Sequence, residues 1–307
     1  MQSFLDPLPQ HIINGLTLGA LYALIALGYS LVYGVLQLLN FAHGDVFMIG
    51  AFIGYGVMAG LMPYESLPPA LIIAAMFIAA MLGCGILGMV IEQYAYRPLR
   101  NSPRIAPLIS ALGVSFFIQS SIQLTLTASF RSYPTAKLIP PDKGLEFFDA
   151  RISATRILVI VTTLVLMVAL TYLVRYTRLG RAMRAVATDR EAAAMMGINV
   201  DRVIVATFFI GSALAGAAGV MNGLVFFRIW HFMGFSAGLK GFTAAVLGGI
   251  GNIPGAMLGG FLLGLTETFA TGYISATFKD VIAFAVLIAV LLIRPRGLLG
   301  AKLQQKV

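Results

Sequence analysis

Three ionisable residues stand within or beside long apolar stretches of this sequence: Asp45, Glu267 and His43. A charge at mid-bilayer costs roughly 2.5–3.5 kcal/mol on insertion scales, so such residues are functional candidates. Proton- or sodium-driven carriers use buried groups of this kind to couple an ion gradient to transport. The alternative is that these few groups cap or pack helix ends near the membrane interface. In that case apolar groups, hydroxyls and backbone line the path of a solute.

The residues that enzymes need for nucleotide, metal or acyl chemistry do not form recognisable patterns here. The sequence has no GxxxxGK(S/T) phosphate loop, no HExxH and no GxSxG. Its three histidines are far apart, and its one cysteine, Cys84, cannot form an internal disulfide or a cysteine cluster. We therefore expect no ATP site, no metal site, no catalytic residues and no cofactor, which counts against an integral membrane enzyme.

The elements that carry these residues follow from composition. Of the 307 residues 59% are hydrophobic and 11% are charged, whereas soluble domains have about 25% charged residues. A bilayer core is spanned by roughly 20 apolar residues in a helix, and the apolar runs here are continuous rather than alternating. The sequence therefore predicts an all-α, polytopic integral membrane protein with about eight transmembrane helices. The apolar runs are 12–39, 46–62, 69–91, 105–127, 157–174, 204–227, 241–270 and 281–293.

Lysine and arginine are distributed unevenly along the chain, whose net charge is +9. Three segments hold 13 of the 21 basic residues and only four acids: 92–104, 175–203 and the C-terminus from Arg294. Because basic residues collect on the cytoplasmic side, we expect all three segments, including the C-terminus, to be cytoplasmic. The connection 128–156, with nearly balanced charge, is expected to be an extracytoplasmic loop of a single permease domain, 1–307. The positive charge thus indicates topology and not nucleic-acid binding.

Two interruptions divide the apolar pattern. If the run 241–270 crossed the membrane once, the basic C-terminus would lie outside, so we expect this run to cross twice as short pieces or to be re-entrant. Four glycines and a proline at its middle hold a regular helix poorly. A second interruption separates the first two runs. Paired interruptions are the best sequence indication of a transporter's central site. The residues that we place near the translocation path are Asn40, His43, Gly44, Asp45, Gly248, Gly249, Gly251, Asn252 and Pro254.

The basic segment 175–203 is longer than a connection between neighbouring helices needs to be. It has almost no helix breakers over 181–196, after which Gly197 suits a helix C-cap and Asn199 or Asp201 can cap the next helix. Its small apolar face consists of Ala192, Ala193, Met195 and Met196. A face of this kind fits a groove in a partner protein.

Glu191-Ala192-Ala193 followed by Gly197 resembles the EAA loop of ABC importer permeases. The downstream Ile-x-Leu-Pro of that pattern is missing, and a Thr-Phe-Phe sequence stands in its place. Four longer segments resemble the LivH-type permeases of bacterial branched-chain amino acid ABC transporters, and the likeness extends through nearly the whole chain. These segments are 14–52, 97–119, 179–204 and 238–260.

The resemblance implies a transmembrane permease subunit of an ATP-driven importer for leucine, isoleucine, valine or related neutral amino acids, in the bacterial inner (plasma) membrane. Its partners would be a second, LivM-like permease, two cytoplasmic ABC ATPase subunits that hydrolyse ATP, and an extracytoplasmic amino-acid-binding protein. The residues implied in ATPase coupling are Glu191, Ala192, Ala193, Gly197 and Arg184. An ion-coupled secondary amino acid carrier remains the alternative, and it requires buried charges such as Asp45 and Glu267.

Overall fold

Helices make up most of the computed structural model, which describes residues 8–64, 66–100, 102–103, 105–126, 128–140, 144–147 and 150–300. The longer helices are α2 (Leu8–Leu36), α3 (His43–Leu61), α4 (Pro69–Ile91), α5 (Ile105–Leu126), α6 (Ala154–Tyr176), α9 (Val200–Phe226), α10 (Met233–Gly248), α11 (Ile253–Tyr273) and α12 (Lys279–Ile293). Two shorter α-helices, α7 (Arg178–Thr188) and α8 (Arg190–Met195), join α6 to α9. The remaining helical turns are the π-helix η1 (Glu92–Tyr96) and the 3-10 turns η2 (Arg97–Leu99), η3 (Thr135–Lys137) and η4 (Ala276–Phe278).

Short strands occur only in connections among the described residues. Strand β1 (Arg131–Ser132) pairs with β4 (Arg228–Ile229), and β2 (Gly144–Phe147) pairs with β3 (Ala150–Ser153), both antiparallel. Eight helical stretches of the described chain are long and apolar enough to cross a membrane. The predicted all-α membrane fold with about eight transmembrane helices is therefore confirmed.

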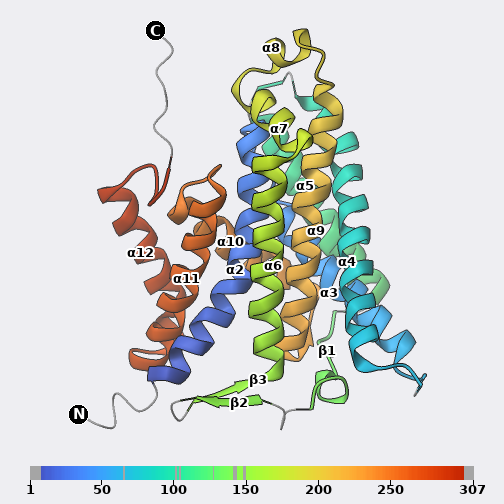
Figure 1. Cartoon of the computed structure of the whole chain (residues 1–307), viewed down its shortest axis with the longest axis vertical. Helices are drawn as coiled ribbons and strands as arrows, with labels where there is room; N and C mark the ends of the chain where they lie inside the picture. Colours follow the sequence, from blue (N-terminus) through green and yellow to red (C-terminus); the bar gives the residue numbers. More distant parts are fainter. Residues whose placement is uncertain are drawn as a thin grey trace.

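The bundle has two distinct ends (Figure 1). The helices α7 and α8 lie at one end, called the α8 end, and the β2–β3 hairpin lies at the other, called the β2–β3 end. The segment around η2 belongs to the α8 end, because Arg97 Nη2 lies 2.6 Å from Asp201 Oδ2 at the start of α9. The start of α2 belongs to the β2–β3 end, where Gln10 Oε1 accepts a hydrogen bond from the backbone N–H of Arg151.

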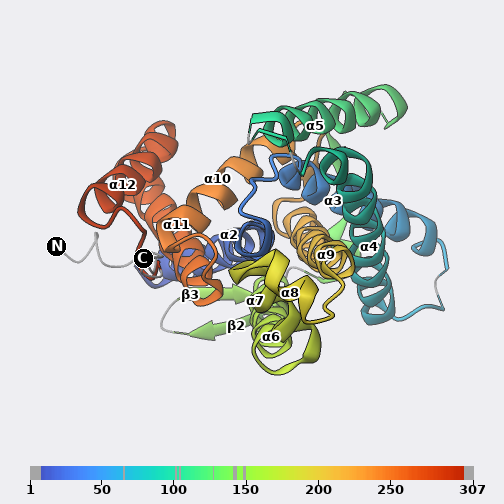
Figure 2. The same ribbon diagram turned by 90° about the horizontal axis from the view of Figure 1, so that it is seen from above.

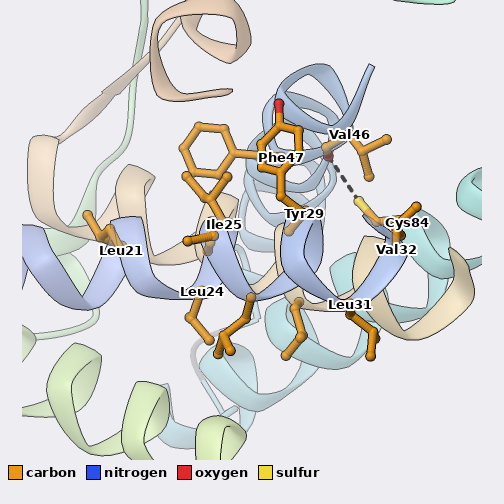
Figure 3. Packing of buried hydrophobic residues seen from close by; sticks show 14 of the residues in the cluster. Leu21, Leu24, Ile25, Tyr29, Leu31, Val32, Val46, Phe47 and Cys84 are labelled. Carbon is orange, nitrogen blue, oxygen red and sulfur yellow. Dashed lines mark hydrogen bonds between the residues drawn. The ribbon is translucent and has the colours of Figure 1, made fainter. Parts of the chain in front are cut away.

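Helix α2 forms the centre of the bundle, with α3, α9, α10 and α11 around it (Figure 2). It has 29 residues, so it is about 43 Å long and connects the two ends. Its apolar side chains pack on every side; in Figure 3 Ile25 and Tyr29 point to one side of the helix, and Leu24 and Leu31 point to the other. Beside them Cys84 is fully buried, and its thiol donates to the carbonyl of Val46 (3.3 Å).

Glycines allow α2 to approach α11 closely. A Cβ built on Gly19 would lie 2.7 Å from the Cα of Phe261, and one built on Gly264 would overlap the backbone of Gly19. Small residues at such contacts let helix backbones pack in lipid, where water does not drive helices together. By contrast Gly56 and Gly60 of α3 have nothing within 4 Å of an added Cβ. Glycine content alone therefore does not identify the packed contacts.

The first predicted discontinuity is confirmed, with a shift of boundary. Helix α2 ends at Leu36, Gln37 has a left-handed φ of 56°, and α3 begins at His43. The non-helical residues are thus 37–42, and Gly44 and Asp45 belong to the first turn of α3. This first turn packs against the start of α10, because Gly44 lies against Gly234 and Gly238.

The second discontinuity is also confirmed and divides the run 241–270 between two helices. α10 ends at Gly248, Gly249 and Gly251 have φ of 105° and 87°, and α11 begins after Asn252. The Asn252 side chain accepts from the N–H of Gly255 (3.2 Å), which caps α11 at its first turn. α11 then runs back to the β2–β3 end, where Gly272 lies against the ring of His11 in α2. The pieces are therefore antiparallel.

Candidate functional site

A cavity of about 520 Å³ lies at the β2–β3 end. Helix ends that meet there supply part of its wall, through residues such as His11 of α2, Arg156 of α6, Phe226 of α9 and Gly272 of α11. Its volume lies within the range of about 300–1,000 Å³ that is common for small-molecule sites. The apolar part of the wall includes Leu18, Leu21, Ile25, Phe47, Val225, Phe226, Trp230 and Met233.

A cluster of charged groups occupies one side of this cavity. Lys240 of α10 and Glu267 of α11 form a salt bridge with Nζ and Oε1 2.6 Å apart, and both line the cavity. The phenol of Tyr22 in α2 donates to the other oxygen of Glu267 (2.8 Å). Lys240 also lies 2.8 Å from Asp280 at the start of α12. The Lys240 and Glu267 side chains are only 12% and 5% exposed, so their mutual pairing offsets the cost of burying charge.

Helical spacing brings these side chains to the cavity. Residues three or four apart share a face of a helix, and Met233, Ala237 and Lys240 follow that spacing on α10. Glu267 and Thr271 do the same on α11. The two charges come from helices on either side of the 249–252 break, so the break lets α11 fold back against α10.

Positive charge exceeds negative charge in the cavity wall. Lys240, Lys279, Arg156 and Arg228 line it, against the single carboxylate of Glu267 among the lining residues that the structure describes. The guanidinium of Arg228 also lies over the ring of Trp230, 5.8 Å from its centroid, which is a cation–π contact between two lining residues. The cavity therefore presents a field that attracts carboxylates.

The residues predicted near the path at 40–45 do not line this cavity. Asn40 accepts hydrogen bonds from the Tyr96 hydroxyl (3.1 Å) and from the N–H of Ala42 (3.2 Å). The buried ring of His43 packs edge-on against Tyr29. These contacts hold the linker between α2 and α3 in place.

Asp45 and Gly44 likewise make contacts within the bundle. The Asp45 carboxylate is buried and accepts from the Gln119 amide of α5 (2.9 Å). Gly44 packs on the first turns of α10. The 40–45 group thus lies where the buried start of α3 packs on the start of α10, close to the cavity-lining residues Phe47 and Met233 but not in the cavity wall itself.

The predicted group at 248–254 lies toward the opposite end of α10. The carbonyl of Gly248 accepts from the N–H of Leu299 (3.0 Å), and the Asn252 amide donates to the carbonyl of Leu299 (2.6 Å). The N–H of Gly251 donates to the Ser30 hydroxyl of α2 (2.8 Å). The first turn of α10 is 15 residues away, about 22 Å along a helix. The structure therefore does not bring the two predicted groups together at one site.

Within the segment 175–203, the stretch 181–196 that lacks helix breakers is divided between two helices, α7 and α8. Asp189 breaks it with an extended φ of −156°, and its side chain caps α8 by accepting from the N–H groups of Glu191 and Ala192. Gly197 has a φ of 81°. The N–H of Gly197 donates to Ala194 and that of Ile198 to Ala193, the pattern of a glycine C-cap. The predicted capping glycine is thus confirmed.

The face of α8 differs from the predicted one. Met195 and Met196 are 81% and 82% exposed, but Ala193 is 4% exposed and packs against the rest of the chain. Glu191, Ala192 and Ala194 are exposed beside the methionines. The apolar surface at the tip of the α8 end therefore consists of Ala192, Ala194, Met195 and Met196, with Glu191 at its edge.

Two arginines attach this segment to the membrane helices. Arg190 donates to the free carbonyl of Leu36, the last residue of α2 (2.7 Å), an arrangement that satisfies a helix C-terminus. Burial lowers the pKa of the Arg190 guanidinium, and the charge of Arg100 lowers it further. Arg184 donates to the carbonyl of Val174 in α6. Arg184, predicted as a coupling residue, therefore makes a contact within the chain.

Sequence reasoning missed Tyr22 and Lys240 as site residues and treated Glu267 only as an isolated charge. Their pairing joins positions 22, 240 and 267, and no local spacing records such contacts. Lys240 stands one residue outside the run 241–270, so it looked like a flanking charge. Across the part of the chain that the structure describes, no three histidine, cysteine or acidic side chains are grouped to hold a metal ion.

Comparison with known proteins assigns a family to this architecture. Residues 11–291 match the family described as branched-chain amino acid transport system / permease component. The chain is 46% identical over 301 residues to the high-affinity branched-chain amino acid transport system permease protein LivH of Salmonella typhimurium. It is 46% identical over 299 residues to LivH of Escherichia coli and 45% identical over 305 residues to BraD of Pseudomonas aeruginosa. Each alignment covers 97% of both chains.

Proposed function

The chain belongs to the branched-chain amino acid transport system permease family, and from that premise we propose that it is the transmembrane permease subunit of an ATP-driven importer for leucine, isoleucine, valine or related neutral amino acids. The structural observation that supports the proposal is that the two ends of the helix bundle differ. A cavity large enough to hold an amino acid lies at the β2–β3 end, and an exposed Ala/Met helix lies at the α8 end.

We place the α8 end in the cytoplasm and the β2–β3 end outside, in a bacterial inner membrane. The basic segments around η2 and over 175–203 lie at the α8 end, which supports this orientation through the positive-inside tendency. After α12 the chain returns to the C-terminal end of α10, where Gly300 packs against Gly249. We therefore propose that the C-terminus is cytoplasmic. The cavity then faces the compartment from which amino acids arrive.

We propose that α8 is the contact with a cytoplasmic ATPase subunit. Its exposed methionines are adaptable apolar groups that suit docking into a groove, and Glu191 adds a charge at the edge. Ala193 makes the buried contact of α8 with the rest of the chain, and Gly197 ends the helix as its C-cap. Because Arg190 joins α8 to the end of α2, a movement of α8 would act on the central helix and bias the inward- and outward-facing states.

The remaining proposed partners follow from the same scheme. A LivM-like second permease would complete the path, two ATPase subunits would supply the energy, and an extracytoplasmic binding protein would deliver the amino acid above the cavity. Asn40, His43, Gly44 and Asp45 are proposed to hold the crossing of α3 and α10 beside the path. The break from Gly248 to Pro254, with Gly249, Gly251 and Asn252, is proposed to hold the cytoplasmic end of α10 against the C-terminal segment.

Uptake into proteoliposomes tests the proposed function. The four kinds of subunit are reconstituted, the binding protein and labelled leucine are added outside, and ATP is enclosed. We expect uptake that requires both ATP and the binding protein and that survives dissipation of proton and sodium gradients. Uptake that continues without ATP but stops when an ion gradient collapses would instead establish a secondary carrier and contradict the proposal.

A further inference from the structure

The cavity at the β2–β3 end contains a buried pair of opposite charges in mostly apolar surroundings, Lys240 and Glu267. We propose that this pair binds the charged backbone of a free amino acid, with Lys240 contacting the carboxylate and Glu267 the ammonium group. The inference rests on the proposed function for its substrate class and adds the residues that recognise the substrate within the permease itself.

Each member of the pair has a second partner, so the pair can open without leaving a bare buried charge. Lys240 keeps Asp280 at 2.8 Å, and Glu267 keeps the Tyr22 hydroxyl at 2.8 Å with Lys279 Nζ at 3.7 Å. A zwitterion that enters between them replaces one ion pair by two. An uncharged solute or a solute with one charge restores at most one of the two contacts that each member gains from a zwitterion, so it does not offset the opening of the pair.

The donors and acceptors also allow a third partner. A lysine ammonium has three N–H donors, and Glu267 and Asp280 account for two of them at Lys240. The Glu267 carboxylate has about four lone-pair directions, of which Tyr22 and Lys240 occupy two. Both groups line the cavity, so a ligand in the cavity can reach them.

Apolar residues that line the same cavity match an aliphatic side chain. Leu21 and Ile25 of α2, with Phe47 of α3 and Val225 of α9, line the same cavity as the charged pair. An amino acid whose backbone lies at Lys240 and Glu267 would therefore place its side chain against these groups, where burial of each CH₂ is favourable. The excess of cations in the wall attracts the carboxylate first.

The same contacts tie α10 to α11 and α12, so the experiment must separate ligand recognition from a clamp between helices. Ser236 provides the probe, because it lines the cavity one helical turn before Lys240 and is exposed. The native Cys84 is fully buried, so Ser236→Cys introduces the accessible thiol that is followed. The reconstituted complex in nanodiscs, without nucleotide or binding protein, is labelled with a small maleimide.

We expect leucine at about ten times its dissociation constant to slow labelling of the Ser236→Cys complex about tenfold. Leucinamide, which lacks the carboxylate, and 4-methylpentanoate, which lacks the ammonium group, are expected to leave the labelling rate unchanged at the same concentration. Protection by either analogue equal to that by leucine would overturn the inference, and so would an absence of protection by leucine. ATP-dependent leucine uptake by the same Ser236→Cys complex separates this outcome from a failure of the proposed function.

Uptake by charge variants gives an independent readout. Lys240→Met and Glu267→Gln are each expected to lower the rate of leucine uptake about tenfold or more, because a buried partner group loses its charge-assisted hydrogen bond. Lys137→Met, an exposed lysine outside the cavity, is the matched control and keeps the parental rate. Stimulation of ATP hydrolysis by the loaded binding protein is expected to persist in all three. Parental uptake in both Lys240→Met and Glu267→Gln would overturn the inference.

Discussion

The cavity at the β2–β3 end and helix α8 at the other end hold their polar groups in opposite ways. At the β2–β3 end the charges of Lys240 and Glu267 are buried and paired between helices far apart in sequence. In helix α8 the backbone groups at the two helix ends are satisfied locally, by the Asp189 cap and the glycine C-cap at Gly197, and the apolar side chains of Met195 and Met196 are exposed.

This difference indicates different partners. Buried opposite charges with an apolar wall suit a small zwitterion that loses its water on entry, whereas exposed methionines on a short, well-capped helix suit a protein surface. Helix α2 connects the ends, because Tyr22 contacts Glu267 near one end and the Leu36 carbonyl accepts from Arg190 at the other. This difference can be tested by substitutions that act separately on the α8 tip, on the packing of α2 against α11, on the contact between α8 and α2, and on the C-cap of α8.

The largest effect is expected from charges on the α8 tip. Met195→Asp combined with Met196→Asp should lower ATP-dependent uptake about 100-fold, because carboxylates in a water-excluding interface are strongly unfavourable. Both side chains are exposed, so insertion and size-exclusion profile should not change. The measurement is uptake together with the amount of ATPase that copurifies. Met195→Leu with Met196→Leu is the apolar control, and unchanged uptake in the aspartate variant would exclude α8 as the docking helix.

Overpacking of the contact between α2 and α11 should affect both ends at once, because α2 connects them. Gly264→Val places side-chain atoms on the backbone of Gly19 in α2, and overpacking of this kind costs about 1–3 kcal/mol or more. We expect a loss of most folded protein in fluorescence-detected size-exclusion chromatography. Gly56→Val, where an added Cβ has nothing within 4 Å, is the control. Equal yields of the two variants would show that the α2–α11 contact does not carry the fold.

A smaller effect is expected from the contact between α8 and α2. Arg190→Met removes the hydrogen bond to Leu36; since the arginine is partly exposed, we discount its value to about 1 kcal/mol, or about a fivefold loss of uptake. ATPase copurification should persist, because the α8 tip is intact. Arg181→Met, an exposed arginine of α7, provides the comparison. A similar uptake for both variants would mean that Arg190 has no role in coupling.

The smallest effect is expected at the C-cap of α8. Gly197 has a φ of 81° and open space around it, so Gly197→Ala costs only the left-handed backbone strain, about 1 kcal/mol. Hydrogen exchange at the Ile198 amide, which bonds to Ala193, should quicken about fivefold while uptake changes less than about twofold. Gly197→Asn should exchange more slowly than the alanine variant, since asparagine tolerates this conformation. Faster hydrogen exchange in the asparagine variant than in the alanine variant would contradict the role of Gly197 as a C-cap.

Features that depend on local sequence were predictable. Composition indicated a helical membrane protein, the Gly/Pro cluster located the break between α10 and α11, and Gly197 and Asn199 were recognisable as caps. The burial of Ala193 was not predictable, because a six-residue helix is too short for its sequence to show which side is buried.

Features that depend on contacts between distant segments could not be predicted. The Lys240–Glu267 pair forms because α11 folds back on α10, and the bond from Arg190 to Leu36 joins residues 154 positions apart. The residues at 40–45 were expected beside the path for their polarity. Among them, Asn40 accepts a hydrogen bond from Tyr96 and Asp45 accepts one from Gln119, and local sequence does not record contacts between such distant segments.

Thiol labelling from the two sides of the membrane tests the opposed roles of the ends most directly. Met195→Cys at the α8 tip and Ser236→Cys in the cavity are each exposed to a membrane-impermeant maleimide in right-side-out and inside-out vesicles. We predict that Met195→Cys without its ATPase partner reacts only in inside-out vesicles and Ser236→Cys only in right-side-out vesicles. Labelling of both positions from the same side, or of Met195→Cys from outside, would contradict the account.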